Sequence, residues 1–338
     1  MVTDSVAHLG VGEKMRALVC SAFGSPQVLA IGTLDAPQPG PEEVAIAVSN
    51  AGVSYVDTLV VADKHQNKHE LPFAPGMEVG GRICAIGPRV EELKVGDKVM
   101  ALVYDGAYAN QAIAPMRECF KLPDEVAEET GAAMVGGYLT SHAALRWQGR
   151  VDAGETVLVL GAAGAVGLAA VQVAKAMGAQ VIAGASTEER LALAKTYGAD
   201  GTINYAVEDV YEATQTLTQG RGVDVVYDPV GGALYEPAFR TLGWGGRYLI
   251  IGFAGGKVPQ FPGNRLLVKN RSAVGFALMH YRKRRTDLLR ASADELLGWC
   301  AKGAISPHIT QRITLEDVPG ALDGLANREV VGKLVARI

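Results

Sequence analysis

Residues 157–167 read Val-Leu-Val-Leu-Gly-Ala-Ala-Gly-Ala-Val-Gly, and this stretch decides the fold of the chain. Its apolar first half predicts a buried strand, and residues 164–177 follow with helical spacing. A glycine-rich turn between a strand and a helix lets a pyrophosphate approach the backbone, and the helix N-terminus offers unpaired N–H groups with a partial positive charge. Ala162 replaces the first glycine of the G-x-G-x-x-G pattern, and Gly161 precedes it.

The segments after this turn alternate between strands and helices. Strands are predicted at 180–185, 202–205, 223–227, 246–251 and 272–277, and helices at 188–197, 207–218 and 233–242. Parallel strands need a crossover of this kind, so the alternation predicts a doubly wound α/β sheet of Rossmann type.

The chain before this region has a different pattern of residues. Up to residue 138, short β-branched runs are separated by Pro, Gly and Asp, with helical spacing only near 54–62 and 124–136. Such a pattern predicts an antiparallel, barrel-like unit. The tail, 277–338, contains a helix near 287–302, a strand near 309–314, a helix at 316–327 and a strand at 331–337, and we expect it to return to the first unit. The predicted domains are therefore 1–138, with 1–14 as a loose leader, 139–276 and 277–338.

Composition bounds the class of protein. The chain has 338 residues, 49% of them hydrophobic, with a net charge of −4, which excludes disorder and fits about two domains. A sequence pI near 5.9 gives no general attraction to nucleic acid or to anionic membranes. No apolar run approaches the roughly 20 residues of a membrane-spanning helix. The four cysteines form no close pair, which argues against disulfides and indicates a reducing cytoplasm.

The end of the second strand distinguishes between dinucleotides. An NAD site places Asp or Glu there for the ribose 2′-hydroxyl, whereas this chain has Ala185-Ser186, with Arg190 one helical turn later. Hydroxyl and guanidinium donors suit a 2′-phosphate, which predicts NADPH, and Tyr205 is expected to cover the adenine side. Ser186-x-x-Glu189 is also a capping box, and the two interpretations are compatible. The neighbouring acids, Glu188 and Glu189, oppose the phosphate electrostatically.

Histidine and cysteine spacing argues against a catalytic metal. Zinc sites of dehydrogenases need three ligands, typically Cys and His. Of six histidines, only His65 and His69 stand four residues apart, in a polar loop. Without a metal, hydrogen-bond donors must stabilise an anionic oxygen of the substrate, which favours a conjugated acceptor over a simple alcohol.

Donor candidates lie in the predicted strand-to-helix turn at 51–57. Tyr55 is a candidate proton donor, and Ser54 is a candidate for orienting the acceptor or the nicotinamide, while Asp57 is expected to cap the helix. Thr140, between the predicted units, could bond the nicotinamide carboxamide or ribose. The strand ending at Phe253 would bring backbone near the nicotinamide.

Several ordered segments resemble one known family. They are Met15-Arg16-Ala17-Leu18-Val19, Ala51-Gly52-Val53, Pro75 to Gly81, Val95 to Val99, Gly154 to Val159, Val223 to Gly232, Gly245-Gly246-Arg247 and Gly332-Lys333. In this order they resemble the medium-chain dehydrogenase/reductase superfamily, in its zinc-independent NADPH:quinone oxidoreductase (zeta-crystallin-like) branch. The resemblance runs from about Met15 to Ile338.

This resemblance implies a fold, an activity and a set of binding residues. The fold is a Rossmann domain inserted in a GroES-like domain, and the cofactor lies in the cleft. The activity is reduction of quinones, or of the C=C bond of α,β-unsaturated carbonyls, by NADPH in a homodimer that pairs the last strands of the sheet, here near 272–277. The implied cofactor residues are Ala163, Gly164, Ala165 and Val166 at the phosphates, Ser186, Arg190 and Tyr205 at the 2′-phosphate, and Thr140, Val230 and Phe253 at the nicotinamide.

Departures from the family pattern affect the catalytic residues. The zinc-dependent relatives have Cys at the position of Ser54 and His at the position of Met77, so two metal ligands are absent. The zinc-independent branch usually has Asn where this chain has Ser54, and a tyrosine is common at Leu59 or at His65. The proton donor therefore stays open among Tyr55, His65 and solvent.

Two alternative functions remain open at this stage. An enoyl-thioester reductase would need cations for a coenzyme A phosphate, for which Lys64, Lys68 and Arg282–Arg285 are candidates. A nucleotide-binding protein with an RNA-binding or structural role is the alternative from another class. The basic run 282–285 lacks interleaved aromatic residues, so we expect a solvated helix entrance rather than a nucleic-acid site.

Overall fold

The computed structural model describes Gly10 and residues 12–338, and these form two compact units. The first unit comprises Met1–Gly136, Ala293–Ala301 and Ser306–Ile338, and the second comprises Gly137–Ser292 and Lys302–Ile305. Most of the predicted leader lies outside the described residues. The helix α10 (Thr286–Ala301) contributes residues to both units.

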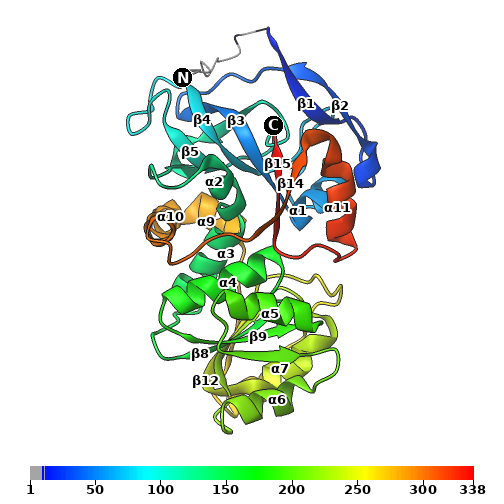
Figure 1. Ribbon diagram of the computed structural model, residues 1–338, viewed down its shortest axis with the longest axis vertical. Helices are drawn as coiled ribbons and strands as arrows, with labels where there is room; N and C mark the ends of the chain where they lie inside the picture. The colour runs from blue at the N-terminus through cyan, green and yellow to red at the C-terminus, as the bar shows by residue number, and fades with distance from the viewer. Residues whose placement is uncertain (1–9, 11) are drawn as a thin grey trace. The chain divides into compact units, whose positions relative to one another are not determined.

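The first unit is built around a mostly antiparallel sheet of seven strands in the order β14-β15-β3-β4-β5-β7, with β6 paired to β3. Its strands are β3 (Glu43–Val53), β4 (Glu78–Ile86), β5 (Lys98–Leu102), β6 (Gln111–Pro115), β7 (Cys119–Lys121), β14 (Ile309–Thr314) and β15 (Lys333–Arg337). A separate hairpin pairs β1 (Lys14–Cys20) with β2 (Leu29–Asp35). Figure 1 shows the C-terminal strand β15, in red, beside β3 near the start of the chain. The tail thus supplies a strand to the sheet of the first unit.

The described part of the first unit also contains the helices α1 (Tyr55–Val61), α2 (Glu128–Met134) and α11 (Val318–Ala326), besides the end of α10. Inward-facing valine, isoleucine and alanine side chains of β3, β4 and β5 form much of its core, together with Val60 of α1 and Leu322 of α11. This core therefore joins α1 to residues from both ends of the sequence.

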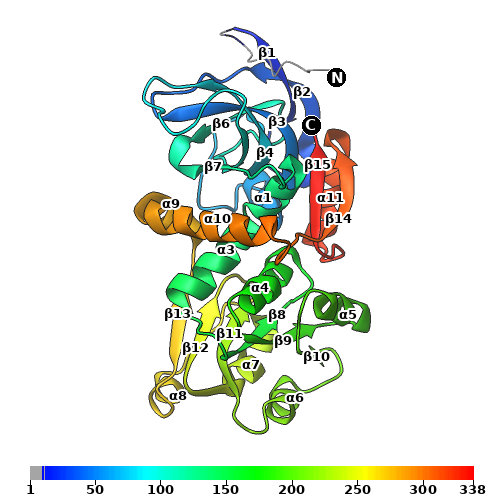
Figure 2. The ribbon, with the colours of Figure 1, turned by 60° about the vertical axis from the view of Figure 1, so that its left-hand side comes forward.

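The second unit is a six-stranded parallel sheet in the order β10-β9-β8-β11-β12-β13 (Figure 2). Its strands are β8 (Thr156–Leu160), β9 (Gln180–Ala185), β10 (Gly201–Asn204), β11 (Val223–Asp228), β12 (Leu242–Ile250) and β13 (Ser272–Gly275). The chain runs outward from β8 through β9 to β10 and then returns to the other side of β8 for β11. Strand order therefore reverses at β8 and β11, and in such sheets ligands bind beyond the carboxyl ends of the strands at this point.

The helices of the second unit are α3 (Gly137–Ala143), α4 (Ala165–Ala176), α5 (Glu188–Thr196), α6 (Val210–Leu217), α7 (Tyr235–Thr241), α8 (Gly263–Leu267) and α9 (Leu278–Arg284). A π-helical turn at Ala144–Gln148 follows α3. The α/β fold class, with a GroES-like first unit and a Rossmann-type second unit, is confirmed.

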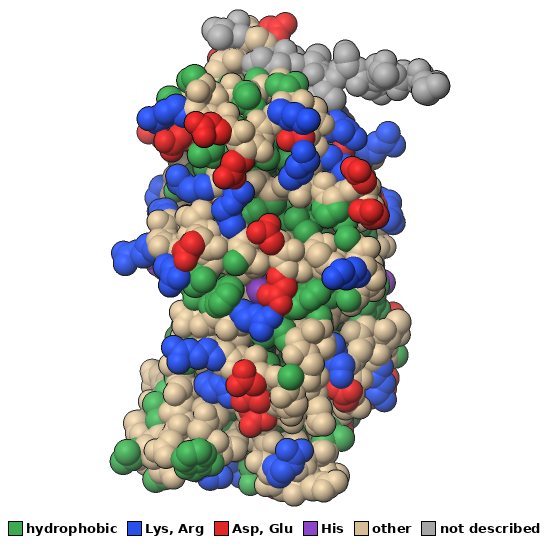
Figure 3. All heavy atoms as spheres, turned by 90° about the vertical axis from the view of Figure 1, so that its left-hand side faces the viewer, with side chains coloured by type: hydrophobic (Ala, Val, Ile, Leu, Met, Phe, Trp, Pro, Cys, Tyr) green, Lys and Arg blue, Asp and Glu red, His purple; other side chains and the backbone are tan. Residues whose placement is uncertain are grey.

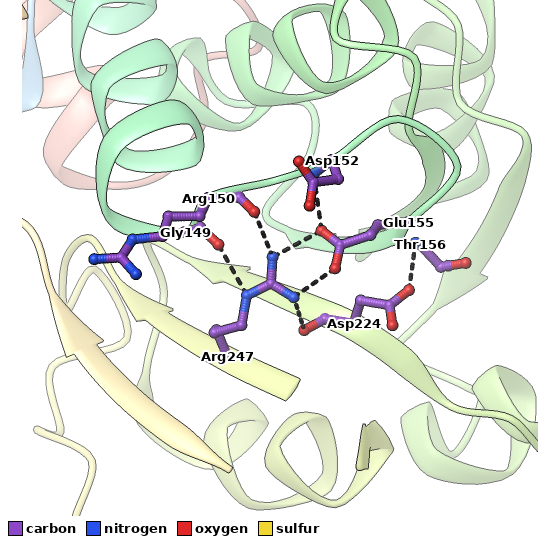
Figure 4. Close-up of polar contacts among 7 residues, drawn as sticks. All are labelled: Gly149, Arg150, Asp152, Glu155, Thr156, Asp224 and Arg247. Atoms are coloured by element: carbon purple, nitrogen blue, oxygen red, sulfur yellow. Dashed lines mark hydrogen bonds and ion pairs between the residues drawn. The ribbon is translucent and has the colours of Figure 1, made fainter. Parts of the chain in front are cut away.

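A cluster of hydrogen bonds and ion pairs around Arg247 joins β12 to the segment before β8, at the amino-terminal side of this sheet (Figure 4). The guanidinium donates to the Gly149 carbonyl at 2.8 Å and to the Arg150 carbonyl at 3.0 Å, and two of its nitrogens lie 2.7 Å from the Glu155 carboxylate oxygens. Arg247 also lowers the pKa of Glu155 against the effect of burial. The cluster lies away from the carboxyl ends of the strands, so it supports the fold rather than the predicted cofactor site.

The basic run 282–285 differs from its prediction. It ends α9, a helix that the sequence pattern did not predict, and Arg282 is only 4% exposed. The prediction of a solvated helix entrance is wrong at Arg282, because the last turn of α9 turns this side chain inward, where it donates to the Met279 sulfur at 3.4 Å. The other three residues of the run are exposed. Among the described residues, no helix is both long and apolar enough to cross a membrane.

Candidate cofactor site and active site

The turn between β8 and α4 has the geometry that a dinucleotide requires. Gly161 adopts a φ of +59°, which favours glycine, and a Cβ on Gly167 would lie 2.2 Å from the Gly161 carbonyl oxygen. Gly164 is the N-cap of α4, and its N–H donates to the Gly161 carbonyl at 3.0 Å. The turn is therefore folded back tightly, and the first N–H groups of α4 face the carboxyl end of the sheet.

The predicted phosphate residues occupy this turn. Ala163 and Gly164 lie in its last two positions, and Ala165 and Val166 open α4. The N–H groups of a helix's first turn have no acceptor within the helix, so those of Ala165 and Val166 can bind phosphate oxygens. These residues fit a pyrophosphate.

Val230 and Phe253, predicted at the nicotinamide, lie in two loops that the structure brings together. The Gly255 N–H donates to the Val230 carbonyl at 2.6 Å, and a Cβ on Gly231 would lie 3.5 Å from the Phe253 ring. Val230 also approaches the turn from Gly161 to Gly167, called the phosphate turn below, since a Cβ on Gly161 would lie 3.0 Å from the Val230 methyl group.

Asp228, at the end of β11, holds the Val230 loop in place. Its carboxylate accepts the Val230 N–H at 2.7 Å, the Gly231 N–H at 2.8 Å and the Tyr248 hydroxyl at 2.6 Å. Burial raises the pKa of Asp228, and these hydrogen bonds oppose that rise. The loop is therefore positioned by a buried side chain to which the sequence analysis gave no role.

Thr140 lies on α3, which is tied to the start of α4. The neighbouring Ser141 hydroxyl lies 3.0 Å from the Val166 carbonyl and 3.0 Å from the Tyr227 hydroxyl. Thr140 itself is half-buried. Its helix is thus placed against the start of α4, and the cofactor role of Thr140 stays a prediction.

The three predicted 2′-phosphate residues come together beyond β9 and β10. The Arg190 guanidinium lies 3.4 Å from the Ser186 hydroxyl, and the Tyr205 N–H donates to the Ala185 carbonyl at 3.1 Å. The cap of α5 is Thr187, whose hydroxyl accepts the Arg190 N–H at 3.3 Å. The capping box predicted from Ser186 and Glu189 is therefore wrong: the N-cap lies one residue later, because β9 continues to Ala185 and Ser186 belongs to the turn. The Ser186 hydroxyl faces Arg190 instead of capping the helix.

In the first unit, Ser54 belongs to a buried ionic cluster. The Lys333 ammonium donates to the Ser54 hydroxyl oxygen at 2.9 Å and forms an ion pair with Glu78 at 2.7 Å. The Ser54 hydroxyl in turn donates to Glu78. Lys333 is 5% exposed and Glu78 is 6% exposed. The single hydroxyl proton of Ser54 is thus engaged within the protein, and its side chain is held at the start of α1.

Asp57 and Tyr108 extend this cluster. One oxygen of Asp57 accepts the Ser54 N–H at 2.9 Å and the Tyr108 hydroxyl at 2.6 Å, which confirms that Asp57 caps α1. Burial raises the pKa of Asp57 to about 6, partly offset by the bond from Tyr108, and nearby Glu78 adds to the rise. Burial also raises the pKa of Tyr108.

The remaining donor candidates differ in exposure. Tyr55 is the first residue of α1 and is 44% exposed, although it is a large aromatic residue. His65 accepts the Asn67 N–H at 3.2 Å, and burial lowers its pKa. His69 lies 3.1 Å from Asp105 and stacks on Phe73. Tyr55 is therefore the accessible phenol at the start of α1.

Comparison with known proteins identifies the family. The family model described as alcohol dehydrogenase GroES-like domain matches residues 40–124, and the one described as zinc-binding dehydrogenase matches 165–294. The quinone oxidoreductase-like protein 2 of Bos taurus is 36% identical over 97% of this chain and 94% of its own length. The quinone oxidoreductase of Pseudomonas aeruginosa is 33% identical over 93% of this chain and 97% of its own length.

The chain belongs to the quinone oxidoreductase branch of the medium-chain dehydrogenase/reductase superfamily. The quinone oxidoreductase structure from Pseudomonas syringae superposes with a TM-score of 0.89 at 31% identity, covering 96% of this chain and 100% of that one. The Escherichia coli quinone oxidoreductase, solved in complex with NADPH, gives 0.87 at 27% identity over 96% and 100%. The resemblance inferred from the sequence motifs is confirmed.

One family description names zinc, and the residues of this quinone oxidoreductase relative do not fit a zinc ion. The Ser54 hydroxyl and the Glu78 carboxylate are already bound by the Lys333 ammonium, whose charge would repel a second cation at the same oxygens. Met77 offers only a thioether beside them. Among the described residues, no three His, Cys, Asp or Glu side chains gather closely enough to hold a metal.

Glu78, Lys333 and Asp228 are three polar residues that the sequence left without a role. All three lie in the family-like segments, and Lys333 opens the otherwise apolar run Leu334-Val335-Ala336. A lysine at the start of a buried strand is a signal for an internal partner, although the pattern does not say which one.

Proposed function

We propose that this chain is an NADPH-dependent reductase of quinones, without a metal ion at its active site. Bound NADPH supplies a hydride. The observation that carries the cofactor choice is the end of β9, where Ala185 and Ser186 replace an acidic residue and Arg190 faces the Ser186 hydroxyl. An acidic residue there would accept a ribose hydroxyl, whereas hydroxyl and guanidinium donors match a phosphate dianion.

The substrate follows from the relatives and from the donors available. Quinone oxidoreductases are among the most similar curated proteins, and the metal-free donor set suits an oxygen that becomes anionic through conjugation. Reducing a quinone to a hydroquinone consumes one hydride and one proton. Reducing the C=C bond of an enone has the same balance, so an enone is the second substrate class.

Tyr55 is the proposed source of the proton. The phenol stands at the first position of α1. The start of this helix is held by the bonds that Ser54 donates to Asp57 and Glu78 and by the bond that it accepts from Lys333. A proton taken from Tyr55 is replaced from solvent, to which the side chain is exposed. Ser54 and its partners keep the turn in place while this happens.

The cations suggested for a coenzyme A phosphate are largely committed elsewhere. Lys68 pairs with Asp63 at 2.8 Å, Arg285 pairs with Asp287 at 2.8 Å, and Arg282 is buried. Acidic and basic side chains are also interspersed on the face shown in Figure 3, which does not favour RNA as a ligand.

A panel of acceptors tests the proposed function. The purified protein is assayed with NADPH and with NADH against 1,4-benzoquinone, simple enones and enoyl-thioesters, following loss of nicotinamide absorbance. We expect NADPH consumption to be fastest with the quinone. No consumption with any acceptor would overturn the proposal, and faster turnover of an enone would reassign the substrate class.

The variant Tyr55→Phe tests the proton donor. General acid catalysis contributes roughly 10²-fold or more, so turnover should fall by about that factor while the dissociation constant of NADPH stays the same. Leu59→Val on the same helix serves as a control for disturbed packing. Unchanged turnover in Tyr55→Phe would assign the proton to solvent.

We also propose a homodimer that pairs through β13. This strand is the last of the six-stranded sheet and has partly exposed side chains, and the neighbouring Leu267 and Val268 are 76% and 75% exposed. Unpaired sheet edges with apolar neighbours are common pairing surfaces. Sedimentation velocity should give the mass of two chains, and a mass of one chain at micromolar concentration would contradict the dimer.

A further inference from the structure

Glu188 presents a problem for the proposed NADPH site. It is the first residue of α5, two positions after Ser186 and two before Arg190. A carboxylate there stabilises α5, because the N-terminus of a helix carries a partial positive charge. The same carboxylate would repel a 2′-phosphate held by Ser186 and Arg190. The site needs a device that keeps this charge away from the phosphate.

Asn204 contacts Glu188 directly. Its side-chain amide nitrogen donates to a Glu188 carboxylate oxygen at 2.7 Å. Asn204 is the last residue of β10 and is 8% exposed, whereas Glu188 is exposed. A buried strand residue thus fixes the side chain of an exposed acid.

The amide of Asn204 is locked in the orientation that this bond needs. Its side-chain oxygen accepts the Ala206 N–H at 3.2 Å, so the NH₂ group must point the other way, toward Glu188. The backbone N–H of Asn204 donates to the Glu208 carboxylate at 2.6 Å. Since the backbone and the amide oxygen are both held, little entropy is lost when the NH₂ group binds Glu188.

The direction of this bond takes the Glu188 carboxylate away from Tyr205, one of the three residues of the proposed phosphate site. Successive residues of a strand point to opposite faces of the sheet. Ile203 and Tyr205 pack in one hydrophobic cluster, so Asn204 between them faces the other side, where α5 packs on β9 and β10. The carboxylate of Glu188 is therefore drawn to the face opposite Tyr205, which we assign to the adenine side of the cofactor.

We infer that Asn204 is a specificity-determining positioning residue: by holding the Glu188 carboxylate on the α5 face, it allows the Ser186–Arg190 pair to accept a 2′-phosphate. This inference rests on the proposed NADPH site. It explains how a glutamate that stabilises a helix coexists with a neighbouring dianion. It also explains why the position of Glu188 in the sequence, taken alone, overstates the repulsion between its carboxylate and the 2′-phosphate.

A double-mutant cycle tests the inference with Asn204→Ala, Glu188→Gln and the pair combined. Dissociation constants are measured by calorimetry for NADPH and NADH, and for adenosine 2′,5′-bisphosphate and adenosine 5′-monophosphate as probes without a nicotinamide. Asn204→Ala should weaken both 2′-phosphorylated ligands roughly three- to tenfold, because it frees a like charge near the phosphate, and should leave the others unchanged. In the Glu188→Gln background the same substitution should have no effect.

Distinct results would overturn the inference. Equal weakening of phosphorylated and unphosphorylated ligands by Asn204→Ala, or a loss that persists with Gln at 188, would indicate a purely structural role for Asn204. Should Asn204→Ala fail to fold, Glu188→Gln alone still decides, because the inference predicts equal or tighter binding of adenosine 2′,5′-bisphosphate and excludes weaker binding.

The proposed site itself is checked separately with Arg190→Ala. If that variant binds adenosine 2′,5′-bisphosphate as tightly as the native protein does, the phosphate assignment fails whatever Asn204 does. If Arg190→Ala weakens this ligand and Asn204→Ala does not, only the role of Asn204 fails.

Discussion

The phosphate turn of the second unit and the Ser54 cluster of the first unit are built in opposite ways. The turn uses backbone and glycine within one short stretch, from Gly161 to Gly167. The cluster uses buried charges from distant segments, since Ser54 and Lys333 are 279 residues apart. Adding a side-chain atom should therefore disturb the turn most, whereas removing one charged partner should disturb the cluster most.

The largest effect is expected from removing the cation of the Ser54 cluster. Lys333→Met keeps the length of the side chain but leaves Glu78 buried without its counter-charge. Breaking a buried ion pair in this way destabilises a protein by about 3–5 kcal/mol. Urea unfolding followed by fluorescence measures the free energy of unfolding.

The double variant Lys333→Met with Glu78→Gln is the matched control. It removes both charges and keeps both shapes, so it should recover most of the lost stability. If the single variant is as stable as the native protein, the pair does not hold the cluster, and the contrast between the two sites disappears.

The same cluster should also give the stability a dependence on pH. The folded pKa of Asp57 is about 6, above its ordinary value of 3.8, so the folded protein keeps a proton that the unfolded chain releases in this range. The free energy of unfolding therefore falls as pH rises from about 4 to about 6, by up to about 3 kcal/mol from this group. Asp57→Asn should remove this fall.

Unfolding curves of the native protein and Asp57→Asn at several pH values measure the difference. The two should diverge between pH 4 and 6, with the native protein losing stability relative to the variant as pH rises. Parallel profiles would show that Asp57 keeps an ordinary pKa. The phosphate turn contains no ionisable side chain, so substitutions there should leave the pH profile unchanged.

The phosphate turn is tested by adding a methyl group rather than by removing a charge. Gly167→Ala puts a Cβ 2.2 Å from the Gly161 carbonyl oxygen, and both atoms belong to the backbone framework of the turn. Crowding of this kind costs about 1–3 kcal/mol of stability. Thermal unfolding should show it as a lower midpoint.

Gly164→Ala is the control at a neighbouring position. Its Cβ would lie 3.5 Å from the same oxygen, an ordinary contact, and its φ of −76° suits any residue. Stability should therefore be nearly unchanged, while NADPH binding weakens because the methyl group occupies the approach to the phosphates. A loss of stability as large as that of Gly167→Ala would mean that Gly164 is as crowded as Gly167, contrary to this prediction.

Arg190→Ala gives the smallest expected effect. The lost charge-assisted contact should raise the dissociation constant of NADPH about tenfold and leave that of NADH nearly unchanged. Titrating both cofactors by fluorescence measures the ratio. Equal changes for the two cofactors would refute the assignment of Arg190 to the 2′-phosphate.

The same contrast explains what the sequence could and could not reveal. Local signals predicted the limits of β9 and β14 correctly, because strand period and flanking turns lie within a few residues. The helix α9 was missed, since its last turn carries three cations and its apolar residues are few. The partners of Ser54 were missed because Glu78 reaches it only when β4 pairs with β3, and Lys333 only when β15 pairs with β3.

The Asn204–Glu188 contact was predictable only in part. The sequence showed that Glu188 would oppose a phosphate electrostatically, but not that Asn204 would bind it. The bond between them depends on the packing of α5 against β10, which no spacing rule in the sequence encodes.

The position of Lys333 on the last strand has a consequence for biosynthesis. While the ribosome is still translating, residues 137–292 can assemble their sheet from one uninterrupted run of nascent chain. The strand β3 and the carboxylate of Glu78, made much earlier, must wait for β15 to leave the exit tunnel. The half of the protein that is synthesised first is therefore the half that matures last.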